Sequence, residues 1–363
     1  MGFKCGIVGL PNVGKSTTFN ALTAANIDAQ NYPFCTIEPN IGMVEVPDPR
    51  LESIAKIASS AKTIPTFMEF VDIAGLVAGA SKGEGLGNQF LGHIRGVHAI
   101  GHVVRCFQDD NITHVNGKID PLADIETIET ELALADIQTL EKALQKCQKL
   151  IKAGNQDAKK DAKNIQIIID TLSNQSPLQP LLEDEDIQAI CANYQLISAK
   201  PTFFIANIPE DITKASPYLE QVQSYAKTKQ APIVTISAAI EAELASLDNE
   251  ERMDYLSSLG MEEPGLNNVI RTGHTMLGLS TFFTAGPKET RAWTIKNHAK
   301  APEAAGVIHT DFEKNFIRAE VIKYQDYIDH KGEQGAKQAG VWHLEGKDYQ
   351  VEDGDILVIR ANA

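Results

Sequence analysis

The fold of this chain is decided by residues 9–16, which read Gly9-Leu10-Pro11-Asn12-Val13-Gly14-Lys15-Ser16. The stretch fits the pattern G-x-x-x-x-G-K-[ST], follows the apolar run 3–8 and precedes a helical pattern that covers 17–25. In such a unit the glycines let successive backbone N–H groups converge on phosphate oxygens at a positively polarised helix N-terminus. A glycine-rich turn without function would need a chance match, which has a probability on the order of 1% in a chain of this length. We therefore predict a phosphate-binding loop, here called the P-loop.

The P-loop pattern assigns separate roles to its side chains. Lys15 should reach the β- and γ-phosphates of a nucleotide and assist catalysis, and the Ser16 hydroxyl should ligate Mg²⁺. The predicted phosphate-binding residues are Gly9, Asn12, Val13, Gly14, Lys15, Ser16 and Thr17.

Strand and helix patterns alternate along most of the chain. Apolar runs at 3–8, 66–71, 99–104, 201–206 and 232–236 read as buried strands separated by helical stretches. Strands connected in this way form a parallel sheet covered on both faces. The predicted class is α/β, with a P-loop NTPase sheet formed from 1–118 and 199–276.

Two further segments depart from this alternation. In 119–198, apolar residues recur every three or four positions on both sides of Gly154, which predicts an inserted antiparallel helical coiled-coil hairpin. From 277 to 363 short strands and turns such as Asp353-Gly354 indicate a small α+β domain.

Composition narrows the class of protein. The 363 residues include 43% hydrophobic and 22% charged residues, with no apolar run long enough to span a membrane. The net charge of −15 argues against broad, non-specific binding to nucleic acids, although a local basic patch is compatible with it. No secretory signal is visible, and the five cysteines contain no C-x-x-C pair. These features predict a cytoplasmic protein with reduced thiols and no membrane contact.

Phosphoryl transfer also requires a magnesium carboxylate and a γ-phosphate sensor. The segment Asp72-Ile73-Ala74-Gly75 closes a predicted strand and has the form D-x-x-G. Asp72 should hold Mg²⁺, and the Gly75 N–H should meet the γ-phosphate. Thr36, in the polar loop between the first helix and the next strand, is the third predicted magnesium ligand, because its hydroxyl lies between the two stronger motifs in sequence.

The residue that orients the attacking water is less evident. Many GTPases place a glutamine directly after D-x-x-G, whereas Leu76 stands here and cannot bind water through its side chain. His114 lies in the loop that follows the strand 99–104, and such loops face the ligand crevice of open α/β sheets. Imidazole can orient or deprotonate water near neutral pH, so His114 is the predicted catalytic residue. The alternative is an exposed loop histidine without function.

Base recognition is predicted at Asn207-Ile208-Pro209-Glu210. GTPases have N-K-x-D at this place, and their aspartate accepts hydrogen bonds from guanine. Glu210 is a longer carboxylate and Ile208 replaces the lysine, so guanine loses its matched acceptor while an apolar slot remains for adenine. Ser237, after the next strand, should close the pocket. We predict ATP, with Mg²⁺ as cofactor, as the preferred substrate.

Taken together, the motifs resemble those of the YchF-type Obg-related ATPases. The resemblance runs nearly end to end and includes residues 12–17, 35–40, 76, 79–87, 207–210, the helical insertion, 306–314 and 346–355. The family implies an adenine-preferring, slowly hydrolysing switch that binds ribosomes. It also implies that the C-terminal segment is a β-grasp domain of the TGS type, associated with RNA and ribosome binding.

A local basic patch coincides with the predicted hairpin turn. It consists of Lys142, Lys146, Lys149, Lys152, Lys159, Lys160 and Lys163. Lysines on exposed helices are usually only solvated, but such a cluster also suits ribosomal RNA phosphates. With the resemblance, it predicts a ribosome partner (the large subunit or the whole 70S-type particle) contacted through the hairpin tip and the C-terminal domain. Two alternatives stay open: a GTPase of the same fold, and a nucleotide-gated scaffold with negligible turnover.

Overall fold

The computed structural model describes residues 3–24, 40–73, 86–109, 111–114, 117–211 and 216–362. The predictions for Thr36, Gly75 and Leu76 therefore fall outside the described residues. The chain divides into two compact units, one made of 1–43 and 69–269 and the other of 44–68 and 270–363.

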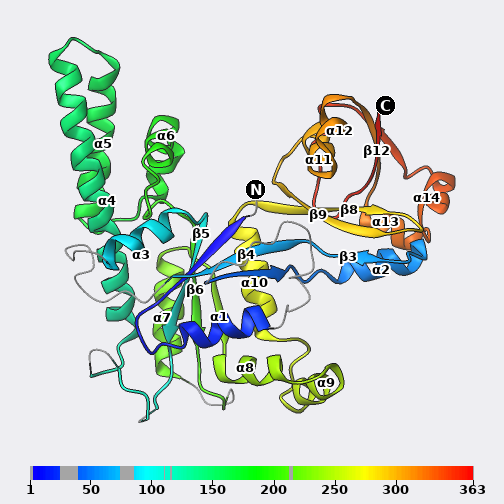
Figure 1. The fold of residues 1–363 in the computed structure, drawn as a ribbon, viewed down its shortest axis with the longest axis horizontal. Helices are drawn as coiled ribbons and strands as arrows, with labels where there is room; N and C mark the ends of the chain where they lie inside the picture. The colour runs from blue at the N-terminus through cyan, green and yellow to red at the C-terminus, as the bar shows by residue number, and fades with distance from the viewer. Residues whose placement is uncertain are drawn as a thin grey trace. The chain divides into compact units, whose positions relative to one another are not determined.

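The first unit is built on a six-stranded sheet with the order β2-β4-β1-β5-β6-β7 (Figure 1). Its strands are β1 (Lys4–Val8), β2 (Ile41–Glu45), β4 (Phe67–Asp72), β5 (Ala99–Arg105), β6 (Thr202–Asn207) and β7 (Ile233–Ile236). Strand β1 pairs in parallel with β4 and β5, and β5, β6 and β7 continue the parallel ladder. All seven residues of β5 are buried, as expected for a central strand covered on both faces. The predicted fold class is confirmed.

Helices lie between these strands and after the last of them along the chain. Helix α1 (Lys15–Ala24) follows β1, α3 (Leu86–Arg95) lies between β4 and β5, α7 (Pro217–Thr228) lies between β6 and β7, and α8 (Ala238–Ser246) and α9 (Asn249–Ser258) follow β7. Strands β1, β4, β5, β6 and β7 run parallel, so their carboxyl ends lie at the same edge of the sheet. The segments that follow these strands are therefore gathered at that edge. These segments include the P-loop and most of the predicted site.

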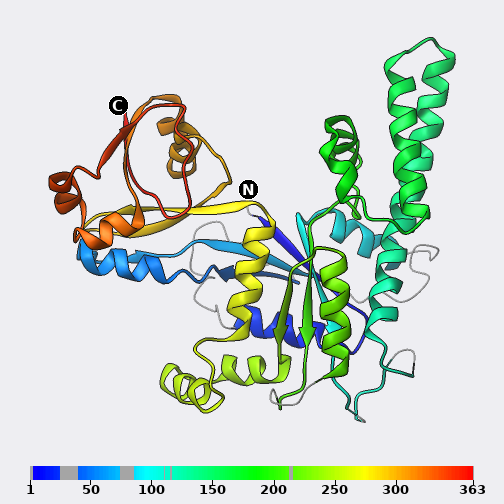
Figure 2. The ribbon, with the colours of Figure 1, turned by 180° about the vertical axis from the view of Figure 1, so that it is seen from behind.

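The inserted hairpin has the predicted form. Helices α4 (Pro121–Lys152) and α5 (Asp157–Ser173) lie side by side (Figure 2), and Gly154 adopts φ +90° in the turn between them. Helix α4 begins with Pro121, a residue favoured at the first position of a helix. The Asp120 carboxylate caps this end by accepting from the Ala123 N–H at 3.2 Å. Helix α6 (Glu185–Asn193), which η3 (Gln179–Glu183) precedes, completes an apolar core with them.

The second unit has its own sheet, with the order β11-β10-β12-β8-β9-β3. Its strands are β3 (Thr63–Ile64), β8 (Leu279–Ala285), β9 (Thr290–Lys296), β10 (Phe316–Ile322), β11 (His343–Glu345) and β12 (Ile356–Ala361). Most pairs are antiparallel, while β12–β8 and β3–β9 are parallel. This agrees with the predicted α+β character, and the β-grasp assignment stays a prediction.

Two apolar clusters pack in this second unit. One contains residues of α11 (Ala301–Ile308), and the other contains residues of α2 (Pro49–Ala58), α13 (Tyr324–Asp329) and α14 (Glu333–Ala339). A short helix α12 (Thr310–Lys314) follows α11, and α10 (Gly265–Met276) precedes β8 in the chain. Residues 44–68, which the sequence placed with the P-loop sheet, group by compactness with the C-terminal segment. One contact between these two segments is the hydrogen bond from the Ser60 hydroxyl to the Gly286 carbonyl, at 2.7 Å.

Four of the five cysteines lie among the described residues. Cys5, Cys106, Cys147 and Cys191 are free and buried. Burial raises the pKa of the Cys5 and Cys106 thiols to about 12, so they stay protonated near neutral pH. No helix in the described ranges combines the length and apolarity that crossing a membrane requires.

Candidate functional site

The P-loop is shaped by left-handed backbone at two positions. Asn12 has φ 63° and Gly14 has φ 92°, a region that favours glycine. A Cβ on Gly14 would lie only 2.2 Å from Asn207 Nδ2. The close approach of Asn207 is therefore a second reason, besides the positive φ, for a glycine at this position. Helix α1 then begins at Lys15, with the Thr18 hydroxyl donating to the Gly14 carbonyl at 2.9 Å. This geometry is the predicted turn from strand to helix.

The first glycine of the motif allows the loop to pass close to the sheet. A Cβ on Gly9 would lie 2.9 Å from the Val103 carbonyl oxygen and 2.9 Å from Val13 Cγ2. Val13 itself is buried, whereas Ser16 and Thr17 at the start of α1 are exposed. The loop is therefore anchored on one side, and the hydroxyls that should meet a phosphate or a metal ion lie on the exposed side.

Lys15 and Asp72 form an ion pair at the end of β4. Their side chains are only 8% and 16% exposed, so the sheet edge brings the predicted phosphate-binding lysine beside the predicted magnesium carboxylate. A carboxylate together with the Ser16 hydroxyl forms an all-oxygen donor set, which is the kind that Mg²⁺ prefers. The residues present fit the ion. Thr36 and Gly75, predicted to complete this arrangement, are not among the described residues.

Asn207 ties the P-loop to the opposite wall of the site. Its buried side-chain amide donates to the Val13 carbonyl at 3.0 Å, and its carbonyl oxygen accepts from the Ala238 N–H at 2.9 Å. The buried Ser237 hydroxyl next to Ala238 has no hydrogen-bond partner among the described residues. Buried polar atoms normally have one, so this hydroxyl is suited to a ligand.

The two residues that depart from the guanine-specific pattern differ in exposure. Ile208 is half-buried and packs against the apolar cluster formed around β5, β6 and α7, and its N–H donates to the Ile236 carbonyl at 2.8 Å. Glu210 is exposed. Ile208 thus contributes apolar surface at the end of β6, and Glu210 stands free to reach solvent or a base.

His114 is buried instead of lying exposed on its loop. Its Nε2 lies 2.9 Å from Asp124 Oδ2, and both side chains are 3% exposed. Burial raises the pKa of Asp124, an effect that the hydrogen bond and charge of His114 partly offset. The loop is also linked to the P-loop, because Asn12 Nδ2 donates to the Thr113 carbonyl at 3.1 Å.

Sequence reasoning did not identify two residues that organise this loop. Arg105, at the end of β5, is fully buried, and its guanidinium donates to backbone carbonyls of the loop that follows. Asp124 lies in the first turn of α4. The only signals were a cation closing an otherwise apolar strand and an aspartate at a helix start, and both patterns are common in proteins without such a role.

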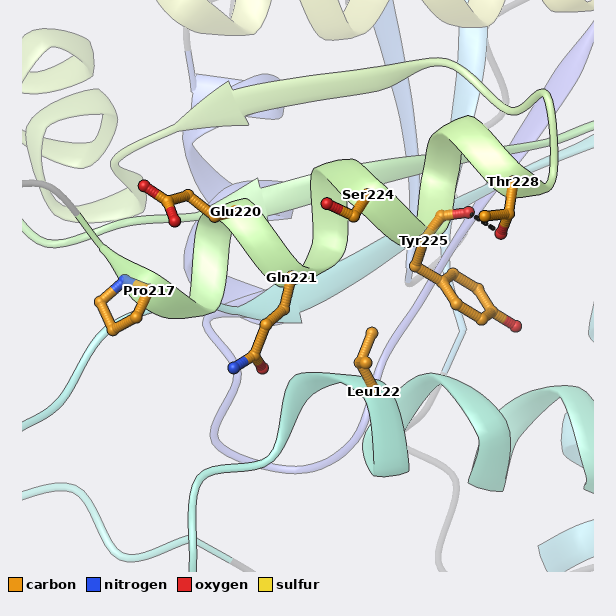
Figure 3. Close-up of a pocket in the computed structure, with 7 residues that line it drawn as sticks. All are labelled: Leu122, Pro217, Glu220, Gln221, Ser224, Tyr225 and Thr228. Atoms are coloured by element: carbon orange, nitrogen blue, oxygen red, sulfur yellow. Dashed lines mark hydrogen bonds between the residues drawn. The ribbon is translucent and has the colours of Figure 1, made fainter.

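A shallow groove of about 510 Å³ lies between α4 and α7 (Figure 3). Its lining residues are Leu122, Pro217, Glu220, Gln221, Ser224, Tyr225 and Thr228. None of the residues predicted to bind nucleotide is among them, so the groove is separate from the candidate site.

Comparisons with known proteins cover the length of the chain. Residues 4–151 match a family described as "50S ribosome-binding GTPase", and residues 279–362 match the C-terminal family of YchF GTPases, described as a "Protein of unknown function". The chain is 59% identical to a Haemophilus ducreyi protein and 48% identical to a Bacillus subtilis protein, with full coverage of both chains in each case. Both relatives are named "Ribosome-binding ATPase YchF".

A solved structure agrees over the same length. The Schizosaccharomyces pombe YchF GTPase superposes with a TM-score of 0.88 at 36% identity, covering 99% of this chain and 97% of that one.

Proposed function

Because the chain belongs to the YchF family, in which the H. ducreyi and B. subtilis relatives are named ribosome-binding ATPases, we propose that it is a nucleotide-dependent switch that hydrolyses ATP in preference to GTP and binds ribosomes. As a member of this family it is a P-loop nucleoside triphosphate hydrolase. The observation that carries the proposal is the convergence of Lys15, Asp72 and Asn207 at the carboxyl ends of β1, β4 and β6.

The residues of the site divide the work of phosphoryl transfer. The P-loop N–H groups and Lys15 hold the phosphates. Ser16 and Asp72, with Thr36, hold Mg²⁺, which neutralises charge on the β- and γ-phosphates when bound. The Gly75 N–H senses the γ-phosphate. Lys15 has to exchange its pairing with Asp72 for the phosphates as the nucleotide enters.

His114 orients the attacking water in place of the glutamine that Leu76 replaces. The hydrogen bond from Asn12 of the P-loop to the Thr113 carbonyl supports a position of this loop near the bound phosphates. Catalytic hydrogen bonds often tighten only in the complex with substrate, so the buried position of His114 is compatible with this role.

Adenine preference follows from the base-recognition residues. Ile208 offers apolar surface to the ring, and Glu210 does not reproduce the shorter aspartate that pairs with guanine. Asn207 and the segment beginning at Ser237 close the pocket. The rival is a GTPase of the same fold, favoured by the description of the S. pombe structure as a GTPase.

The nucleotide preference is tested by equilibrium titration and steady-state turnover with ATP and GTP. We expect tighter binding and faster hydrolysis of ATP. A preference for GTP in both measurements would replace the ATPase with the GTPase, and tight binding without turnover would leave the nucleotide-gated scaffold.

The ribosome is the proposed partner, through the large subunit or the whole 70S-type particle, with RNA contacts at the hairpin tip and the C-terminal unit. A ribosome partner in turn implies a cytoplasmic location. Cosedimentation with 70S particles and separated subunits, in ATP, ADP and no nucleotide, tests both the partner and the switch. Binding that ignores the nucleotide would contradict the switch.

A further inference from the structure

The carboxylate of Asp124 is buried beside His114. Asp124 is 2% exposed, and its Oδ2 lies 2.9 Å from His114 Nε2. Its other oxygen, Oδ1, is also buried and has no hydrogen-bond partner among the described residues. Burying a carboxylate costs free energy unless hydrogen bonds compensate for the lost hydration. For Asp124 the contact with the imidazole ring of His114 supplies part of that compensation.

The backbone around His114 is held from both ends of its loop. Arg105 donates from Nε to the Phe107 carbonyl at 3.2 Å, from Nη2 to the Asp109 carbonyl at 3.2 Å and from Nη1 to the Ile112 carbonyl at 3.0 Å. The next carbonyl, that of Thr113, accepts from Asn12 of the P-loop. These bonds hold the described backbone that leads up to His114, and a contact of its side chain bears on the orientation of the ring.

The helix that supplies Asp124 is itself fixed. Glu129, further along α4, accepts from the Tyr225 hydroxyl and from Lys229 Nζ, each at 3.0 Å, and both donors belong to α7 and its end. Leu122 faces α7 (Figure 3), and Ile125 is buried in the apolar cluster between β5, β6 and α7. Asp124 therefore reaches His114 from a rigid base.

We propose that Asp124 is a positioning residue for hydrolysis, which fixes the orientation and tautomer of the His114 ring. A carboxylate that accepts from one imidazole nitrogen determines which nitrogen carries the proton and where the other one points, as in hydrolytic triads. This inference rests on the proposed role of His114 in orienting the attacking water.

The test combines Asp124→Asn and His114→Ala, alone and together, in single-turnover and steady-state ATP hydrolysis. Asparagine keeps the shape of Asp124 and removes its charge. We expect kcat to fall at least tenfold in Asp124→Asn, because the ring remains but its orientation is lost, with KM for ATP within about twofold of the parent. In the double variant the fall should be no greater than in His114→Ala alone, because Asp124 acts through that ring.

The matched control is Glu126→Gln, which removes an exposed carboxylate two residues along the same helix and should leave kcat unchanged. ATP affinity reports whether each variant is folded, and Asp124→Ser replaces Asp124→Asn if the latter does not bind ATP. An unchanged or raised kcat in Asp124→Asn, or an equal fall with and without His114, overturns the inference. A His114→Ala variant with parental turnover instead removes the proposed role of His114 itself, and the two failures are thereby distinguished.

Discussion

The Asn207 amide nitrogen donates to the Val13 carbonyl oxygen at 3.0 Å, so a residue at the end of β6 holds the P-loop in place. The same side chain accepts from the Ala238 N–H at 2.9 Å. Asn207 therefore joins the two segments that we propose to bind the phosphates and the base. It lies 194 residues from Val13 and 31 residues from Ala238 in the sequence.

Replacing this bridge should weaken binding of both nucleotides. Asn207→Ala leaves a buried carbonyl and a buried N–H unsatisfied, which costs about 1–3 kcal/mol for each group. We expect the Kd for ATP and for GTP to rise about tenfold or more, with their ratio nearly unchanged, as measured by equilibrium titration. A changed ratio with unchanged ATP affinity would show that Asn207 reads the base and does not hold the loops.

Gly14→Ala should abolish nucleotide binding while leaving the rest of the protein folded. Gly14 has φ 92°, and an added Cβ would lie 2.2 Å from Asn207 Nδ2, so the change strains the backbone and displaces the bridge together. Titration with ATP and circular dichroism measure the two effects. Gly92→Ala is the control, because an added Cβ there meets nothing within 4 Å. Parental affinity in Gly14→Ala would refute this account of the P-loop.

Restoring the guanine-type residues should recover part of a preference for GTP. In the double variant Ile208→Lys with Glu210→Asp, a matched acceptor for guanine is regained, and one such hydrogen-bond pair contributes roughly 1–3 kcal/mol. The ratio of ATP to GTP affinity should therefore shift about five- to a hundredfold toward GTP. Recovery should be partial, because Ile208 packs against an apolar cluster that lysine cannot replace without moving.

The single variant Glu210→Gln separates charge from geometry in this experiment. It removes the exposed carboxylate without shortening the side chain, so it should not improve GTP binding. If Glu210→Gln shifts the preference as far as the double variant does, the length of the carboxylate is not what excludes guanine.

The sequence was sufficient for elements with long periodic patterns or strict motifs. The strand before the P-loop, predicted at 3–8, is β1 (Lys4–Val8), and the predicted turn at Gly154 lies between α4 and α5. These signals are local, because the spacing of apolar residues within a segment indicates which face of that same segment is buried. The gathering of Lys15 and Asp72 also followed, since parallel strands end at one edge of a sheet.

Contacts set by tertiary packing left no such signal. β3 has only two residues, Thr63 and Ile64, and its pairing with β9 more than 220 residues later cannot be read from either segment. The pairing of His114 with Asp124 joins a loop to a helix start, and no periodicity relates the two. Sequence reasoning placed His114 in the loop after β5, where the structure has it, but offered no signal for its contact with Asp124.

The base of the hairpin should depend on a buried aspartate. Asp136 of α4 is fully buried and accepts from the Ile197 N–H at 3.0 Å and the Ser198 N–H at 2.7 Å. Asp136→Ala leaves both donors without this acceptor, so we expect a loss of about 2–4 kcal/mol in the free energy of unfolding. Denaturant titration measures it. Glu141→Ala, an exposed site on the same helix, should change it by less than about 0.5 kcal/mol. Equal effects would contradict a special role for Asp136.

Ribosome binding should depend on the lysines at the hairpin tip. All seven lysines of the patch are exposed, and among the pairs found for the described residues only Lys160 has an ion-pair partner, Asp186 at 2.5 Å. Unpaired lysines can neutralise RNA phosphates and release counterions, so their contribution to binding falls as the salt concentration rises.

In Lys149→Glu with Lys152→Glu, we expect the affinity for 70S particles to fall at least tenfold at about 0.1 M salt. The slope of log K against log[salt] should become shallower by about one for each phosphate that the variant no longer neutralises. Cosedimentation across a salt series measures both, and ATP hydrolysis without ribosomes should stay at the parental rate. The matched control is Lys118→Glu with Lys227→Glu, which makes the same charge change at exposed positions of the first unit that lie outside the lysine patch. If both pairs weaken binding equally, net charge alone accounts for the attraction, and the hairpin tip is not where the ribosome binds.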